Sequence, residues 1–500
     1  MKNMRKKRLI WNTASSLLFQ LTTILCGFIL PRLILQYYGS DVNGLVSSIT
    51  QFLQIIAFLE LGVGAVVQSS LYKPLANKND KETSKIIVSA QRFFRRLAII
   101  LLVYVVFLFF VYPRFVEFDF FYTAILILAM CISTFAQYYF GVVDRLLLTA
   151  DQRGYIQYTA QTVTLILNTA VCAVMIYFGA SIHIVKLTTS LIYLIRPVVL
   201  RLYVNRHYKL NRHIKYDSEP IKQKWNGVAQ HISAVVLDST DSIVLTLFST
   251  LSSVSIYSVY HLVIYGIKQL FTSMTNGIQS LLGELWARQE IEELEKTFSW
   301  TEWCIHTGAT LLFGCTGSLI VPFVMVYTNG INDANYVVPD FAILITIAHA
   351  MHCLRLPYNM MILAGGHYKQ TQHNYIIAAI INIVVSIVVV SFWGLIGVAI
   401  GTLAAMLYQT IWMAYYNSKN FIKWKFKYFA KQLVIDSVTY VIGYFASGFI
   451  KLGDVSYISW IWMAIPVVAI WSAVVGMINI IFYRDKIMQL IKTVKKRFAK

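Results

Sequence analysis

Long apolar stretches alternate with short polar segments along the whole chain. Fourteen of these stretches are long enough to cross roughly 30 Å of hydrocarbon as α-helices. They lie at about 10–33, 44–71, 93–112, 120–147, 155–178, 182–204, 225–248, 253–283, 298–328, 338–365, 371–392, 394–417, 429–450 and 458–483. The pattern therefore predicts an all-α integral membrane protein with about 14 transmembrane helices.

Basic residues are concentrated in alternate polar segments. Of the 43 Lys and Arg residues, 36 lie in segments that fourteen crossings place on one side of the membrane, together with both termini. Because Lys and Arg favour the cytoplasmic side in short loops, we expect a multi-pass membrane protein. Both termini are expected to be cytoplasmic.

The composition agrees with a bilayer environment and excludes several other classes. The chain is 57% hydrophobic and 13% charged, and its mean hydropathy is +0.61. The net charge of +20 is spread over short loops beside spans, where anionic lipid is a simpler partner than nucleic acid. The six cysteines lie in predicted spans without a C-x-x-C pair, so neither a disulfide framework nor a zinc site is predicted.

An internal duplication divides the first twelve spans into two sets of six. The segments QSSLYKPLANKNDKETSK, from Gln68, and QSLLGELWARQEIEELEK, from Gln279, share six of 18 residues, and three shorter matches occur at nearly the same offset. Two pseudo-symmetric six-helix bundles of equal orientation would surround a central cavity. We therefore predict an N-terminal six-helix lobe at 1–204, a cytoplasmic basic linker at 205–224, a C-terminal six-helix lobe at 225–417, two additional helices at 418–483 and a basic cytoplasmic tail at 484–500.

Three acidic residues stand inside predicted spans, where an ionisable group costs about 2.5–3.5 kcal/mol and normally faces protein or water. Glu60 lies midway along the second span, and Asp238 and Asp241 lie one turn apart in the seventh. We regard all three as candidates for gating or for coupling to Na⁺ or H⁺. The alternatives are an interhelical hydrogen bond or ion pair for Glu60 and a solvated cavity wall for the two aspartates.

Basic residues inside spans form a second group of candidates. His349, His352 and Arg355 recur at steps of three, so they share a slowly drifting helix face that Pro357 is expected to kink. Arg196 and Lys268 lie deep in their spans. A guanidinium can hold a phosphate bidentately and an ammonium acts as a point charge, so these side chains are predicted to line a hydrated, anion-binding cavity.

Lys268 and Lys186 each have a further interpretation. The repeat offset places Lys268 opposite Ala57, one turn from Glu60, so a Lys268–Glu60 salt bridge across the two lobes is predicted. Lys186 lies near the outer edge of its span, where snorkelling to the interface is the favoured interpretation. The histidine pair lacks a third ligand nearby in sequence, so no metal site is predicted.

Two patches resemble bacterial polysaccharide flippases of the multidrug/oligosaccharidyl-lipid/polysaccharide exporter (MOP) superfamily. They are LELGVG followed by LYKPLA near the second span, and LRLPYNMMILAGGHYKQTQHNYIIAAIINIVVSIVVVSFWGLIGVAIGT at 354–402. The resemblance implies a location in the bacterial cytoplasmic (inner) membrane and transport of undecaprenyl-diphosphate-linked oligosaccharide repeat units to its outer leaflet, for capsule or O-antigen assembly. It also implies that 1–204 rocks against 225–417 around a cationic cavity. The candidate substrate contacts in this cavity are Arg355, Arg196, Lys268, His352 and His349.

This interpretation excludes a catalytic role and calls for no cofactor other than a coupling Na⁺ or H⁺. The expected partners are the lipid-linked oligosaccharide, membrane lipids and polysaccharide polymerase machinery, with no nucleic acid. One alternative is a multidrug or organic-cation exporter of the same superfamily. The other is a membrane polysaccharide polymerase or ligase, which usually has a large outer loop, whereas the predicted outer loops here are short.

Overall fold

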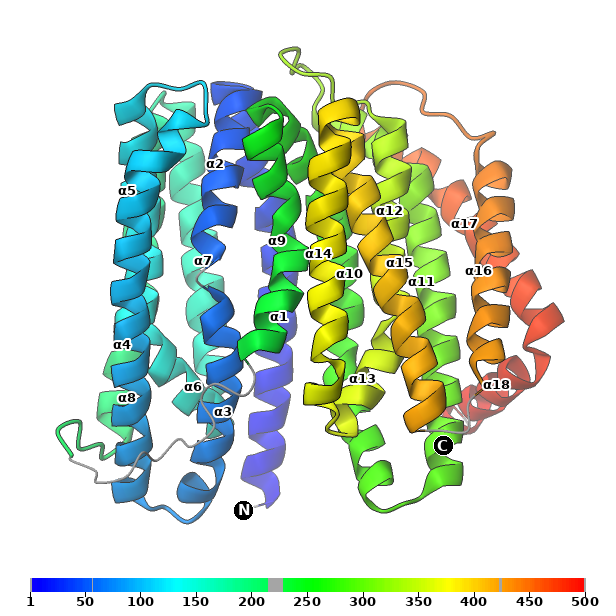
Figure 1. The fold of residues 1–500 in the computed structure, drawn as a ribbon, viewed down its shortest axis with the longest axis horizontal. Coiled ribbons are helices and arrows are strands. Elements are labelled where there is room, and N and C mark those ends of the chain that lie inside the picture. Colours follow the sequence, from blue (N-terminus) through cyan, green and yellow to red (C-terminus); the bar gives the residue numbers. More distant parts are fainter. Residues whose placement is uncertain (1, 56, 215–227, 422–424, 499–500) are drawn as a thin grey trace. The chain divides into compact units, whose positions relative to one another are not determined.

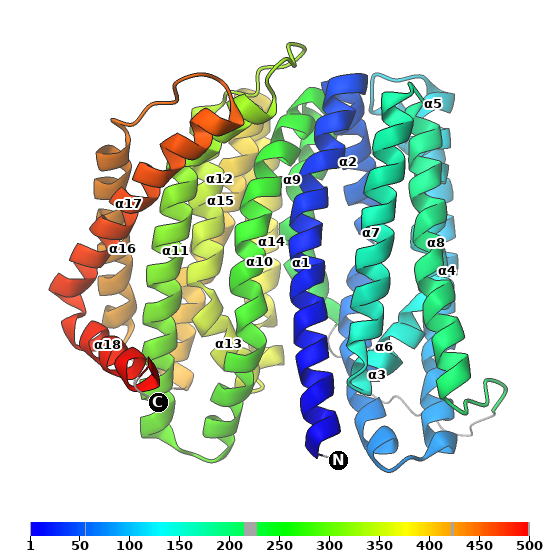
Figure 2. The ribbon, with the colours of Figure 1, turned by 180° about the vertical axis from the view of Figure 1, so that it is seen from behind.

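The computed structural model describes residues 2–55, 57–214, 228–421 and 425–498, and the regular elements in these ranges are all helices. The chain divides into two compact units, Met1–Ser255 (unit 1) and Ile256–Lys500 (unit 2). Figures 1 and 2 show the helices of both units from opposite sides. The predicted all-α class is confirmed.

The described residues of unit 1 form nine α-helices, one 3₁₀ turn, one π-helical turn and the beginning of α10. In chain order these are α1 (Lys2–Tyr38), α2 (Ser40–Gln54), α3 (Ala57–Ala76), α4 (Asp80–Val111), η1 (Tyr112–Arg114), α5 (Phe120–Ala136), the π turn η2 (Gln137–Gly141), α6 (Val142–Ala150), α7 (Gly154–Tyr177), α8 (Ile182–His207) and α9 (Val228–Phe248).

Unit 2 contains most of α10 and the helices that follow it. These are α10 (Leu251–Ala287), α11 (Ile291–Tyr327), α12 (Pro339–Leu354), α13 (Leu356–Ala364), α14 (Tyr368–Trp393), α15 (Leu395–Asn420), α16 (Phe426–Ser447), α17 (Tyr457–Phe482) and α18 (Arg484–Phe498).

Ten helical segments of the described residues are long and apolar enough to cross a membrane, and each coincides with a predicted stretch. The other four stretches are helical too. Stretch 44–71 is divided between α2 and α3, and the others are α9 from Val228 onward, α10 and α16. Many large apolar side chains on these helices are exposed, as lipid-facing side chains must be. The chain is a multi-pass membrane protein with about 14 spans.

Several helix boundaries follow directly from the local sequence. Asn79 accepts a hydrogen bond from the Glu82 backbone N–H at 3.0 Å and so caps α4. Asp119 caps α5 in the same way through Tyr122. The predicted kink before Pro357 is confirmed, because a turn at Arg355 separates α12 from α13.

Within unit 1, α2 packs closely against α9 and the start of α10. The Ser48 and Thr246 hydroxyl oxygens are 2.6 Å apart, and the Asn43 amide donates to Ser255 Oγ at 2.8 Å. A Cβ atom on Gly44 would overlap the Leu251 carbonyl group, so only glycine permits this approach. We call this contact region the α2–α9 seam.

The beginning of the predicted linker is attached to unit 1. Asp144, fully buried on α6, accepts hydrogen bonds from Arg201 at 3.2 Å and from Arg212 at 3.1 Å. The Tyr208 hydroxyl donates to Asp151 at 2.6 Å. The rest of the linker, from residue 215, lies outside the described residues, as does the start of the predicted C-terminal lobe at 225.

The predicted lobes differ from the two compact units in where the chain is divided. The prediction assigns α9 to the second lobe, whereas contacts with α2 and α3 place α9 in unit 1. The lobes at 1–204 and 225–417 therefore remain a prediction.

In unit 2, the two helices beyond the predicted twelve-span core are attached through a buried tryptophan. Trp471 of α17 is fully buried, and Cβ atoms on Gly314 of α11 or Gly443 of α16 would overlap its ring. The Trp471 indole N–H also donates to Ser318 Oγ at 3.0 Å. Beyond α17, the short helix α18 turns away from the direction of α17 (Figures 1 and 2).

Candidate functional site

One face of α8 lines two adjoining cavities within unit 1, with volumes of about 550 and 250 Å³. The contributing side chains recur every three or four residues, which is the spacing of one helical face. They are Lys186, Thr189, Ser190, Tyr193, Arg196, Pro197 and Leu200. An otherwise apolar membrane helix thus presents a continuous polar strip to an internal space.

Polar side chains from neighbouring helices complete the walls of both cavities. Ser133, Thr134 and Gln137 border both cavities and so connect them. The contributions of α7 and α2 are amides and a hydroxyl, from Gln157, Gln161, Asn168, Thr50 and Gln54. Such groups can donate and accept hydrogen bonds with several ligand hydroxyls at once.

A local irregularity of the backbone shapes the wall of the smaller cavity. Gln137 begins the π turn η2, and such turns inside membrane helices often occur at functional sites. The turn ends at Gly141, where an added Cβ atom would lie only 3.0 Å from Pro197 Cβ on α8. Glycine therefore allows α8 to approach η2 closely.

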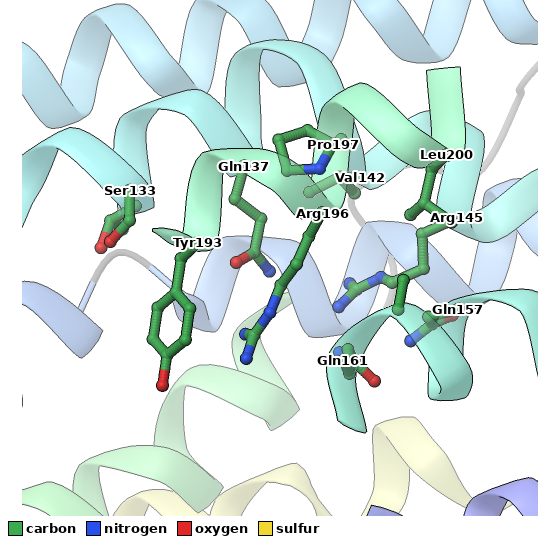
Figure 3. A pocket seen from close by; sticks show the side chains of 13 residues that line it. Ser133, Gln137, Val142, Arg145, Gln157, Gln161, Tyr193, Arg196, Pro197 and Leu200 are labelled. Carbon is green, nitrogen blue, oxygen red and sulfur yellow. The ribbon is translucent and has the colours of Figure 1, made fainter. Parts of the chain in front are cut away.

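Arg196 is held in place at the junction of these walls. Its Nε donates to the Thr164 hydroxyl at 2.7 Å, and its guanidinium lies 3.8 Å from the centre of the Tyr193 ring. Figure 3 shows Tyr193 and Arg196 extending from α8 side by side, with Gln137 next to them and Gln161 across the space. A fixed guanidinium of this kind is prepared for a planar anionic group.

The charge of the two cavities is exclusively positive among the described residues that line them. Arg145 and Arg196 border the smaller cavity and Lys186 the larger one, and neither set of lining residues includes Asp or Glu. Lys186 and Arg196 are ten residues apart on α8, which corresponds to about 15 Å along the helix axis. The site is therefore suited to an extended, hydroxyl-rich ligand that carries negative charge.

Unit 2 brings together the other predicted cations. Lys268 of α10, His349 of α12 and Arg355 are all buried. Arg355 Nη2 lies 2.9 Å from His352 Nδ1, and the charge of Lys268 acts on the same imidazole. Lys268, His349, His352 and Arg355 thus all belong to unit 2. Their contact with a substrate remains a prediction. Arg196 belongs to the other unit.

The predicted acidic candidates all lie in unit 1. Glu60 is in α3 and Asp238 is in α9, but their side chains lie outside the described residues. Asp241 is buried in α9, and α9 packs against both α2 and α3. The proposed Glu60–Lys268 salt bridge therefore stays a prediction.

Sequence reasoning missed two of the three cations in the unit 1 cavities. It interpreted Lys186 as a snorkelling side chain and did not single out Arg145, whereas both line internal space. The spacing of Lys186, Thr189, Tyr193 and Arg196 within one apolar stretch was the available indication. The position of Arg145 depends on tertiary packing and has no comparable indication in the sequence.

No model of a known protein family matches the sequence, and no curated protein matches it. Solved structures do show similarity. The lipid II flippase MurJ in an inward closed conformation is 14% identical, with a TM-score of 0.72, covering 96% of this chain and 100% of MurJ.

Multidrug transporters of the MATE family are also similar in structure. An inward-facing multidrug resistance MATE family transporter of the MOP superfamily is 13% identical, with a TM-score of 0.60, covering 79% of this chain and 94% of that one. The Vibrio cholerae MATE transporter VcmN is 13% identical, with a TM-score of 0.59, covering 82% of this chain and 96% of that one. The chain therefore shares the fold of MurJ and of these MATE transporters, in agreement with the fold that the resemblance in its sequence implies.

Proposed function

We propose that this protein is a flippase for undecaprenyl-diphosphate-linked oligosaccharide repeat units. It would move them from the inner to the outer leaflet of a bacterial cytoplasmic membrane for assembly of capsule or O-antigen-type polysaccharide. The observation that carries the proposal is the pair of polar cavities along α8, whose described lining residues include no Asp or Glu. These cavities lie inside a membrane fold similar to that of a lipid II flippase.

The chemistry of the cavity walls matches the chemistry of such a substrate. A diphosphate and its sugars cannot enter hydrocarbon unaided, because each unpaired polar group would cost several kcal/mol. Arg145 and Arg196 would offset the diphosphate charge, and the amides of Gln157 and Gln161 would replace water around the sugars. The polyprenyl chain would stay in the lipid.

The α2–α9 seam supports alternating access as the transport cycle. In the predicted topology Asn43 and Leu251 lie near the outer surface, and the seam joins a helix of the predicted first lobe to one of the second. Two of its hydrogen bonds, Asn43 to Ser255 and Ser48 to Thr246, involve small neutral side chains. We propose that these contacts close the outer end and separate when 1–204 rocks against 225–417.

Export of organic cations or drugs is the second candidate, and the similarity to MATE transporters favours it. A cationic ligand would require acidic or aromatic groups in the cavity. The described lining of both cavities offers tyrosines but no carboxylate, together with three cations. Electrostatics therefore favours an anionic substrate.

The test is the accessibility of lipid-linked oligosaccharide in cells depleted of this protein, probed with an impermeant lectin. Repeat units that accumulate on the inner leaflet support the flippase. Repeat units that reach the outer leaflet unpolymerised contradict it and favour a polymerase or ligase.

A further inference from the structure

Unit 2 contains a group of ionisable side chains that the proposed substrate cavities do not use. Glu302 and His306 lie one turn apart on α11, and their exposed fractions are 1% and 0%. Asp436 lies on α16, 130 residues further along the chain from His306. Buried ionisable groups in membrane-spanning helices are costly and are commonly found in proton pathways.

The central contact joins His306 to Asp436. His306 Nδ1 lies 2.6 Å from Asp436 Oδ2. Because a carboxylate oxygen only accepts, Nδ1 carries the proton and donates it. The carboxylate thereby fixes the imidazole ring in one tautomer, with the Nε2 lone pair on the opposite side of the ring.

Nε2 of His306 is the atom at which the charge can change. It is buried, and the described residues provide it with no hydrogen-bond partner. The rings of Tyr358 and Phe429 each lie with their centres 6.4 Å from the imidazole centre and enclose it. In general, a carboxylate paired with an imidazole ring favours the charged form of the ring, whereas burial opposes it.

A cavity of about 230 Å³ connects Asp436 with internal space between α11, α12 and α16. The Asp436 side chain is 14% exposed, and Thr310, Ser437 and Tyr440 provide further polar groups on the wall. The remaining wall is apolar, apart from the backbone. Water in this cavity would have the polar partners that it needs and would bring protons as far as Asp436, on the Nδ1 side of His306.

Other charged and titratable groups around the pair set the electrostatic balance. The Tyr358 hydroxyl donates to Glu302 Oε1, and Lys486 Nζ donates to the backbone and side chain of Ser299, one turn before Glu302. The groups concerned are Glu302, Cys304, Tyr358, Asp436, Tyr483 and Lys486. With neutral His306 their formal charges sum to minus one, and with imidazolium they sum to zero.

From this geometry we infer that His306, oriented by Asp436, is a proton-binding site. Uptake of one proton at Nε2 converts the neutral imidazole into imidazolium, and the charge of the His306–Asp436 pair changes from minus one to zero. Because low dielectric favours neutral buried clusters, the bound proton strengthens the attachment of α16 to α11. Its use in coupling transport to a proton gradient rests on the proposed function.

Thermal unfolding of the purified full-length protein, followed by tryptophan fluorescence between about pH 5 and 8, tests this site. The variants are His306→Gln and Asp436→Asn, with His373→Gln as the control at an exposed position of unit 2. We expect the Tm of the wild type and of the control to fall by about 2–4 °C more than that of His306→Gln as pH rises.

The pH dependence, and not the absolute Tm, decides between a proton site and a purely structural contact. Loss of the pH-dependent part in both His306→Gln and Asp436→Asn supports the inference. A His306→Gln protein with a lower Tm at every pH but with the wild-type pH dependence overturns it. The experiment contains no transported substrate, so its outcome is independent of the proposed function.

Discussion

Arg196 and Thr164 are joined by a hydrogen bond of 2.7 Å from the guanidinium Nε to the hydroxyl oxygen. This contact, with the Tyr193 ring on which the guanidinium lies, fixes one cation of the unit 1 cavities before any ligand arrives. Preorganised charge lowers the entropy that binding must overcome. Arg196 is accordingly the residue at which the proposed function is most sensitive to mutation.

We expect Arg196→Ala to lower polymer export at least about tenfold, since a charge-assisted hydrogen bond contributes about 1.5–3 kcal/mol. Protein abundance should stay normal. Arg206→Ala, at the exposed end of the same helix, serves as the control. Measurement of surface polysaccharide alongside membrane protein levels checks this, and wild-type export by Arg196→Ala removes this residue from the substrate site.

Replacement of Arg355 by Ala should also abolish export without loss of protein. Arg355 is buried at the turn between α12 and α13, beside His352. Its guanidinium is predicted to contact the substrate. Lys369→Ala is the control, because Lys369 lies at an exposed position on α14, and this variant should leave export unchanged. The same two assays apply, and normal export from the Arg355→Ala strain would restrict the site to unit 1.

The Gly44→Ala variant is expected to open the α2–α9 seam. The added methyl group would overlap the Leu251 carbonyl, so α2 must move away from α10. Gly64→Ala is the matched control, because its Cβ would meet Leu146 at an ordinary contact distance of 3.5 Å. A cysteine at Ser255 should react faster with a polar maleimide in Gly44→Ala than in Gly64→Ala, and equal rates would contradict the tight packing.

Removal of the buried Asp144 carboxylate should destabilise unit 1. Arg201 and Arg212 both donate to it, and both are partly exposed, so we expect Asp144→Ala to cost about 2–3 kcal/mol. Glu284→Ala, which breaks the exposed pair with Arg288, should cost less than about 1 kcal/mol. Thermal unfolding compares the two, and equal losses of Tm would show that Asp144 does not hold the linker in place.

Lys486, on α18 beyond the last span, is expected to make the stability of the protein depend on pH in the alkaline range. Burial lowers the pKa of its ammonium group from 10.5 to about 8. Between these values the folded chain has lost a proton that the unfolded chain keeps, so this group's contribution to stability rises with pH from about 8 to 10.5. In Lys486→Arg, which stays charged, the alkaline gain in Tm should disappear; a Lys486→Arg profile parallel to the wild type would contradict the lowered pKa.

The membrane helices were predictable because their length and apolarity are dictated by the bilayer. The proximity of His352 and Arg355 was predictable, since the step of three fixes a shared face. The proximity of Lys268, on α10, to His352 was not predicted, because it depends on the packing of different helices. The division of the second span into α2 and α3 was missed, because no proline marks the break.

The Glu302–His306 step of four on α11 was visible in the sequence but was not singled out. Its partner Asp436 could not be predicted, because no local pattern joins positions 130 residues apart. The position of Arg145 at a cavity wall could not be predicted for the same reason, because no local sequence pattern indicates it. Residues brought together by tertiary packing of different helices require a structure.

The proposed function requires that this protein itself moves a lipid-linked oligosaccharide across the bilayer. The most direct test uses the purified protein in liposomes that contain undecaprenyl-diphosphate-linked oligosaccharide, with an impermeant glycosidase outside. We expect nearly all of the substrate to become cleavable with wild-type protein, whereas Arg196→Ala liposomes should stay close to the protein-free level of about half. Cleavage that remains at half with wild-type protein would show that the protein does not move this substrate.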